Sequence, residues 1–209
     1  MGNVRLASAL VTFVFAPLSA HAGDELGREP EPLLVHGTRV GGSNADAALA
    51  VRVDEEGYTY VAGWARSLDF PGCDGRSPEN GRDAVLFKLA PNGQELVWSL
   101  TLGGRGDDEA VALALADDGS VFVGGTTHSH DFPTTRNAHD RSHDGGMDAF
   151  VVRVSATGNL LWSTLLGGQA EEQLAGLALT SSGQVTLAGT TRSPDFPLTS
   201  EGVLRAPLG

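Results

Sequence analysis

The sequence predicts an all-β repeat protein. One tract, consisting of a glycine pair, a glycine turn, a V(A/G)G run and a DFP tripeptide, occurs three times. The copies start at Gly41, Gly103 and Gly167, which are 62 and 64 residues apart. The apolar runs between these motifs are short, rich in Val, Phe and Thr, and broken by Gly and Pro, a pattern that favours strands over helices. A sequence repeated at such a period is one structural unit, so the fold is predicted as an array of similar small sheets.

The second copy contains two predicted β-hairpins. Residues 110–115 and 121–126 flank a turn at Gly119, and residues 149–154 and 160–165 flank a turn at Gly158. Short apolar runs around a glycine turn are typical of hairpins, so each unit is predicted to form four antiparallel strands. The corresponding strands of the first copy are predicted at residues 51–53, 58–62, 84–89 and 96–100.

The first strand of each unit is apolar on both faces. In the second copy, Val111, Leu113 and Leu115 alternate with three alanines, so one predicted face is large and the other small. A strand that is apolar on both faces lies between two layers. Radially packed blades produce this environment, because the small face of one sheet admits the large face of its neighbour.

The repeat also resembles a known family. The strings LTLGGRGDDEAVALALADDGSVFVGGTTHSHDFPTT and DAFVVRVSATGNLLWSTLLGG are similar to the SBBP repeat, a bacterial module named for the seven-bladed β-propeller. The resemblance covers residues 33–199. It implies a propeller of four-stranded blades in exported or surface proteins, and it implies no reaction.

The units encode fewer than three blades. Residues 33–36 resemble the last strand of a preceding unit; full units follow at 41–102 and 103–166, and a partial unit spans 167–209. The expected total is about eleven strands, whereas rings close with four to eight blades. Three explanations remain open: a truncated copy of a longer array, self-association that completes a ring, or a short open stack. The stack is the least favoured, because it leaves apolar faces and strand edges in water.

Residues 1–22 are predicted to be a signal peptide. Arg5 precedes an apolar stretch, and Ala20-His21-Ala22 has the small-residue pattern of a cleavage site. The apolar stretch is too short to span a bilayer comfortably. Residues 23–32 are then a linker, and residues 33–209 a single repeat domain. The mature protein is expected in the periplasm, at the cell surface or in the medium, without a membrane span.

The chain is acidic, with 14 Lys and Arg against 26 Asp and Glu and a formal net charge of −12. This charge argues against nucleic acid as a partner. Many acids lie near the glycine pairs and turns, and the sequence favours a solvated rim for them. The members of this predicted rim are Asp46, Asp54, Glu55, Glu56, Asp107, Asp108, Glu109, Asp117, Asp118, Glu171 and Glu172.

Most repeated residues are predicted to be structural. The DFP aspartates, Asp69, Asp131 and Asp195, suit acceptance of backbone hydrogen bonds in a turn, with the phenylalanine anchoring the loop. Trp98 and Trp162 occupy equivalent positions and are expected to pack between blades. Trp64 is different, because the other copies have threonine at its position, so it is the predicted individual binding residue, for a protein or carbohydrate ligand.

The loop at residues 128–144 is the candidate metal site with the most unusual local chemistry. It brings together imidazoles and carboxylates, which are suitable ligands for zinc, while the acidic loops could take calcium. The candidate ligands are His128, His130, His139, His143, Asp140 and Asp144. Their spacing matches no fixed metal-binding motif, so the expectation is that the protein has no cofactor.

The sequence therefore favours an exported, non-enzymatic β-propeller repeat protein that acts as a binding or structural scaffold. No nucleophile elbow, phosphate-binding loop, CxxC or HExxH motif occurs. The alternatives are a metal-binding propeller enzyme that uses the histidine loop, and a truncated fragment of a longer array. No catalytic residue is assigned.

Overall fold

A computed structural model describes residues 10–17, 32–73 and 81–198 of the chain. Within these ranges the chain forms twelve β-strands and no helix, which confirms the all-β prediction. Every strand pairs with its neighbours in antiparallel fashion. Across the same ranges, no helix has the length and apolarity needed to cross a membrane.

The repeat units form separate sheets, and each full unit is one four-stranded blade. Blade 1 has the strand order β3-β4-β5-β6, and blade 2 the order β7-β8-β9-β10. The strands of blade 1 are β3 (Asp46–Val53), β4 (Thr59–Ala65), β5 (Asp83–Leu89) and β6 (Leu96–Leu102). Those of blade 2 are β7 (Asp108–Leu115), β8 (Val121–Thr127), β9 (Asp148–Val154) and β10 (Leu160–Leu166). The predicted division of each unit into two hairpins is thus confirmed.

The third unit provides a half-blade within the described residues. It consists of β11 (Glu172–Leu179) and β12 (Val185–Thr191), which pair only with each other there. Two full blades and one half-blade agree with the expectation of fewer than three.

The predicted hairpin turns depend on glycine. Gly57, Gly93, Gly119, Gly158 and Gly183 each have a positive φ, between 66° and 87°. This left-handed region costs little for a residue without a Cβ, so glycine recurs at the same point of every unit. The turns therefore set where each strand pair begins.

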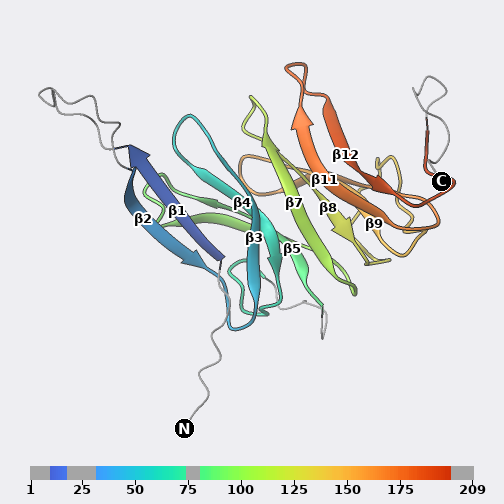
Figure 1. The fold of residues 1–209 in the computed structure, drawn as a ribbon, viewed down its shortest axis with the longest axis horizontal. Helices are drawn as coiled ribbons and strands as arrows, with labels where there is room; N and C mark the ends of the chain where they lie inside the picture. Colours follow the sequence, from blue (N-terminus) through green and yellow to red (C-terminus); the bar gives the residue numbers. More distant parts are fainter. Residues whose placement is uncertain (1–9, 18–31, 74–80, 199–209) are drawn as a thin grey trace, which may run out of the picture.

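The blades stack face to face in a row, with β7 between blade 1 and β11 (Figure 1). One face of blade 1, including Tyr60, Ala62 and Leu86, shares a buried cluster with Leu113 and Phe150 of blade 2. Apolar area removed from water at this interface is the main term that holds the two sheets together. Residues of both blades therefore form one buried apolar cluster.

A β-bulge in each first strand changes the predicted alternation. In blade 2 the register shifts between Ala110 and Ala112, which pair with the adjacent residues Gly125 and Gly124. Adjacent residues of a strand point to opposite faces, so Ala110 lies on the face of Leu113 and not with Ala112. The prediction that Ala110, Ala112 and Ala114 share one mostly small face is therefore wrong for Ala110. Equivalent shifts occur between Ala48 and Ala50 and between Leu174 and Gly176.

The first blade is preceded by a two-stranded sheet of β1 (Leu10–Pro17) and β2 (Pro32–Val40). The strand predicted at residues 33–36 lies within β2. β1 occupies part of the predicted signal peptide, residues 1–22, whose other residues, including the cleavage site, lie outside the described ranges. All of the predicted linker except its last residue, Pro32, lies outside them as well. Signal cleavage therefore stays a prediction.

Candidate functional site

The DFP aspartates bind the backbone beside the glycine pairs. Oδ1 of Asp69 accepts hydrogen bonds from the Ser43 amide at 2.7 Å and from the Ser43 hydroxyl at 2.9 Å. Asp131 and Asp195 accept from the amides of Arg105 and Gln169, at 2.8 and 3.0 Å. These bonds lower the pKa of Asp69, because they favour the charged carboxylate. The structural role predicted for these residues is confirmed.

A second repeated acid, which opens each first strand, binds the glycine pair itself. Asp46, Asp108 and Glu172 accept from the amides of Gly42, Gly104 and Gly168, at 2.9, 3.0 and 2.9 Å. All three acids are buried, with exposed fractions of 3%, 0% and 2%. The prediction that they belong to a solvated rim is wrong, because the bend at the glycine pair buries amides that need acceptors.

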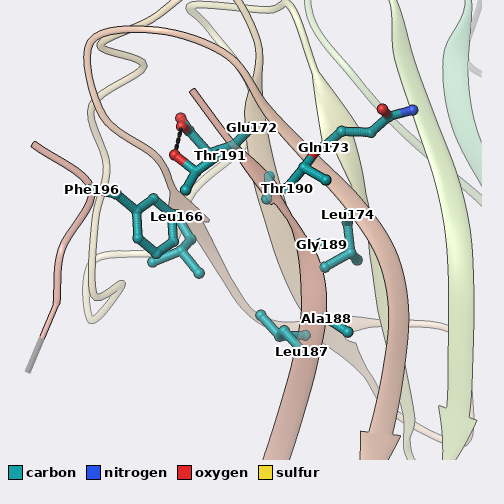
Figure 2. Close-up of a pocket in the computed structure, with 11 residues that line it drawn as sticks. Leu166, Glu172, Gln173, Leu174, Leu187, Ala188, Gly189, Thr190, Thr191 and Phe196 are labelled. Carbon is teal, nitrogen blue, oxygen red and sulfur yellow. Dashed lines mark hydrogen bonds between the residues drawn. The ribbon is translucent and has the colours of Figure 1, made fainter. Parts of the chain in front are cut away.

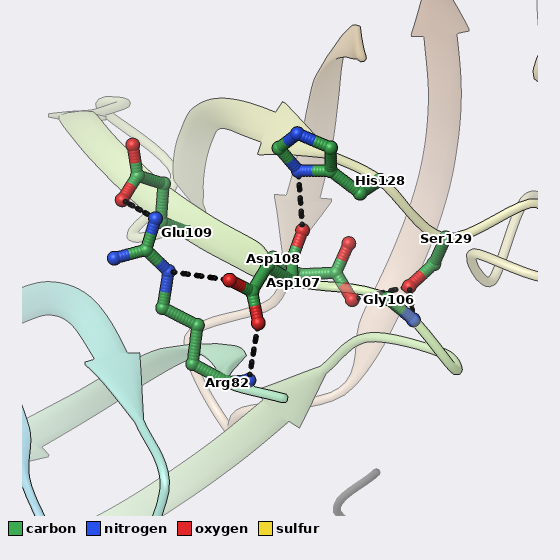
Figure 3. Close-up of polar contacts among 7 residues, drawn as sticks. All are labelled: Arg82, Gly106, Asp107, Asp108, Glu109, His128 and Ser129. Carbon is green, nitrogen blue, oxygen red and sulfur yellow. Dashed lines mark hydrogen bonds and ion pairs between the residues drawn. The ribbon is translucent and has the colours of Figure 1, made fainter. Parts of the chain in front are cut away.

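A serine two residues before the aspartate of each DFP motif completes this network. The hydroxyls of Ser67, Ser129 and Ser193 each accept a backbone amide at 2.8 Å. Ser129 also donates to Asp108 at 2.7 Å, as Figure 3 shows. Sequence reasoning missed these serines, although their fixed place in an SxDFP string was a usable signal.

Two buried carboxylates flank the first glycine at each junction between blades. A Cβ on Gly103 would lie 2.3 Å from Oδ1 of Asp83 and 2.8 Å from Oδ2 of Asp108. At Gly167 the equivalent atoms belong to Asp148, at 2.5 Å, and Glu172, at 2.9 Å. Burial raises the pKa of Asp108, and it also raises that of Asp148, to which the charge of Glu172 adds. Space for the paired acids explains why both positions are glycine.

A salt-bridge cluster occupies the junction of blades 1 and 2 (Figure 3). The Arg82 guanidinium contacts Asp107 at 3.8 Å and Glu109 at 3.0 Å, and its amide donates to Asp107 at 3.1 Å. The Arg82 carbonyl accepts from the Asp108 amide at 2.6 Å, as Met147 does from Glu172 at 2.7 Å in the next junction. Both junctions therefore have the same backbone hydrogen bond. The ion pairs of Arg82 occur at the first junction, because the second has Met147 at the equivalent position.

Trp64, the predicted individual binding residue, is covered by cations. The guanidinium carbon of Arg82 lies 5.2 Å, and that of Arg66 6.0 Å, from the centre of its ring. The indole is half-buried. Both distances are within the roughly 6 Å at which cation–π contacts are favourable, so Trp64 packs against the salt-bridge cluster through Arg82.

The other two tryptophans differ from each other in their contacts. Trp98 of blade 1 donates through Nε1 to the Ala156 carbonyl of blade 2 at 3.0 Å. This contact confirms the predicted packing between blades for Trp98. Trp162 instead makes an edge contact with Phe122 of its own blade, with ring centres 5.8 Å apart.

The six candidate metal ligands are spread along their loop. His128 and His143 approach the carbonyls of Asp107 and Thr127, each at 3.2 Å, and the rings of His130 and His143 lie 4.4 Å apart. Asp140 accepts from the Ser142 amide at 2.8 Å. His139 and Asp144 are exposed. In the described ranges, no three His, Cys, Asp or Glu side chains gather in a way that could hold a metal ion.

An apolar pocket lies between blade 2 and the half-blade (Figure 2). Its volume is about 280 Å³. Leu174, Leu187 and Gly189 of the half-blade form one side, and Ala149 and Leu166 of blade 2 form another. Phe196, from the third DFP motif, lines its outer part and points toward Leu166. The sequence did not predict this pocket, which adjoins β12, the strand that corresponds to β8 of blade 2.

Comparison with known proteins gives one partial similarity. No protein-family model matches the chain. A stretch of 131 residues, 59% of the chain, is 30% identical to part of the regulatory protein FlaEY of Caulobacter vibrioides. The chain spans 14% of that protein's length. It is thus similar to one segment of a much longer protein.

Proposed function

We propose that the protein is an exported, non-enzymatic repeat scaffold of propeller type that acts as a binding or structural module. One observation carries this proposal: the polar residues that recur in every unit are used to hold the backbone at the glycine pairs. Oxygens of Asp46, Asp69 and Ser67 all accept amides of the same bend in blade 1. Polar residues whose oxygens bind the backbone stabilise the fold. Ligand recognition then depends on the residues that differ between units.

The binding role is supported by the end of the blade stack. The half-blade combines an apolar pocket with a strand, β12, that pairs on one side only within the described residues. Concave apolar sites and open strand edges are both surfaces by which proteins recognise partners. Self-association that completes a propeller is also part of this proposal, through the exposed apolar residues of β3 in blade 1, Leu49, Val51 and Val53.

The export role rests on the predicted signal peptide at residues 1–22. It is tested by expressing the full chain in a Gram-negative host and measuring its mass in the periplasmic fraction. We expect loss of residues 1–22 from the exported form. A chain that stays in the cytoplasm at its full mass would contradict export.

The non-enzymatic role is tested by metal analysis of the exported protein, because the histidine loop is the candidate site of the alternative. We expect purified protein without stoichiometric zinc or calcium, and an unchanged melting temperature in EDTA. His139→Ala with His143→Ala serves as the matched variant. Bound metal that this variant loses would instead support the metal-binding enzyme.

A further inference from the structure

Blade 2 shows which side chain completes the interface between two blades. Phe150, in its third strand, is fully buried and pairs with Gly125 of β8. A Cβ at Gly125 would lie 2.6 Å from the Phe150 ring, so the ring covers this glycine. The Phe132 ring stacks on it with centres 4.6 Å apart. Ala84 and Leu102 of blade 1 belong to the same buried cluster.

The pocket is lined by the equivalents of these neighbours. In the next units Gly125, Phe132 and Ala110 correspond to Gly189, Phe196 and Leu174, and Ala84 and Leu102 correspond to Ala149 and Leu166. All five corresponding residues line the pocket. The space of about 280 Å³ is therefore the place that Phe150 fills one blade earlier. It exceeds the roughly 150 Å³ that accommodates benzene in an apolar protein cavity.

The edge of β12 supplies the second half of the site. In blade 2, β8 pairs with β7 on one side and with β9 on the other. In the half-blade, β12 pairs with β11 alone among the described residues. Its outer backbone groups are thus oriented to add a strand, and extended peptides bind sheet edges in this way.

We propose that the edge of β12 and the adjoining pocket bind an extended strand of another polypeptide, with an aromatic residue seated against Gly189 and Phe196. The strand carries apolar residues at alternating positions, as Phe150, Val152 and Val154 do in β9. In the register of blade 2, its aromatic residue pairs with Gly189 and its next two apolar residues pair with Leu187 and Val185. This site deepens the proposed function and rests on it.

The two faces of the bound strand are expected to matter unequally. In blade 2, Phe150 faces blade 1, whereas Val151 pairs with Gly124 and points to the opposite face, toward the half-blade. On the half-blade, that opposite face of β12 carries exposed residues such as Ala188 and Thr190. Binding should therefore depend on the residue of the bound strand that corresponds to Phe150, and it should change little when the residue that corresponds to Val151 is replaced.

A synthetic peptide tests the proposal. Residues 147–155, with a lysine added at each end for solubility, are labelled and titrated with the exported protein while fluorescence anisotropy is measured. We expect saturable binding. The Phe150→Ala peptide should bind at least about tenfold more weakly, and the Val151→Ala peptide within about twofold. All three peptides have the same net charge, so attraction to the acidic protein does not distinguish them. N-methylation along the peptide backbone should abolish binding, because it removes the donors that pair with β12.

Two protein variants locate the site. Phe196→Ala should weaken binding of the parent peptide about tenfold, because the phenylalanine ring of the peptide then has no aromatic ring to stack on. Leu198→Ala is the matched control: Leu198 is 57% exposed and close in sequence, and its replacement should leave binding unchanged. Melting temperatures of both variants, measured alongside, show that each is folded.

Several results would overturn the proposal. These are equal binding of the Phe150→Ala peptide, binding that survives N-methylation, a stable dimer that excludes the peptide, and binding that appears only when the chain is shortened to end at Leu198. The last two would assign the site to a second copy or to the chain's own following residues. An exported, metal-free protein that binds no peptide disproves this inference alone, whereas cytoplasmic retention or stoichiometric metal disproves the proposed function.

Discussion

Buried carboxylates at the starts of the first strands are the main chemical feature at the residue scale. Asp108 has no exposed surface, and burial raises its pKa despite bonds from Ser129 and Gly104. The serine and amide contacts identify the acid as an acceptor for a bend in the chain. Titration of Asp108 should therefore change the free energy of unfolding.

The raised pKa of Asp108 predicts a loss of stability as pH rises. Between the ordinary value near 4 and the raised folded value, the folded protein binds more protons than the unfolded chain, so the free energy of unfolding falls with increasing pH. Asp148 acts in the same direction. Asp108→Asn should reduce this fall, as measured by urea unfolding between pH 4 and 8. The lowered pKa of Asp69 acts oppositely: its contribution to stability is present above about pH 4 and is lost as the pH falls below that value, so Asp69→Asn should remove its part of the slope in the acid range and leave the slope above about pH 4 unchanged. Identical pH profiles for Asp108→Asn and the parent protein would refute the assignment.

Close approach at Gly125 predicts a sensitive position. A Cβ there would lie 1.9 Å from the Glu109 carbonyl oxygen and 2.6 Å from the Phe150 ring. Gly125→Ala should lower the free energy of unfolding by about 2–3 kcal/mol, or prevent folding, because neither neighbour can move freely. Gly176→Ala is the control, since no atom lies within 4 Å of its added Cβ. Denaturant titration of both variants measures the difference, and equal stabilities would contradict the packing described.

At the scale of elements, the same DFP motif contributes differently in each unit. Phe132 is buried and stacks on Phe150, while Phe196 is half-buried at the edge of a pocket. The DFP tripeptide is the same in both units, and the difference comes from Phe150, which stacks on Phe132. A motif's energetic value thus depends on its neighbours in the blade.

This difference predicts unequal costs for equivalent substitutions. Phe132→Ala should reduce the free energy of unfolding by about 3–5 kcal/mol, because it opens a cavity in the blade interface. Phe196→Ala should cost less than about 1 kcal/mol, since the ring is already partly in water and its removal enlarges an existing pocket. Paired thermal or urea unfolding curves check the ratio. Similar losses from the two variants would show that the third unit is packed like the second.

At the scale of the whole molecule, the stack of blades has apolar surface at its first strand. Leu49, Val51 and Val53 of β3 are 47%, 49% and 58% exposed, whereas Leu113, the equivalent of Val51, is 1% exposed in β7. β7 packs between β3 and β11, whereas β3 packs against β7 on one side and makes only a few contacts with β1 on the other. Exposed apolar surface of this kind favours association.

Substitutions on β3 should therefore reduce self-association without unfolding the protein. Val51→Thr combined with Val53→Lys removes apolar surface at exposed positions, so the melting temperature should change little while the weight-average mass at high concentration falls. Val97→Thr is the control, because Val97 is 45% exposed on β6, at the other edge of blade 1. Light scattering over a concentration series measures the mass. A mass that falls equally in the control would argue against β3 as the contact.

The sequence alone determined the all-β fold, the hairpin pairs and the turn glycines, because hydrophobic alternation and left-handed turns are local properties. It also indicated the structural role of the DFP aspartates, since a residue repeated in each unit serves a need of each unit. Only the tertiary structure decided the burial of Asp46, Asp108 and Glu172, the bulge that moves Ala110 to the face of Leu113, and the arginines that cover Trp64. Each of these depends on which strands pair and on which loops lie against them. The pocket at Gly189 and Phe196 depends on tertiary structure for the same reason, because it is defined by a strand that blade 2 has and the described half-blade lacks.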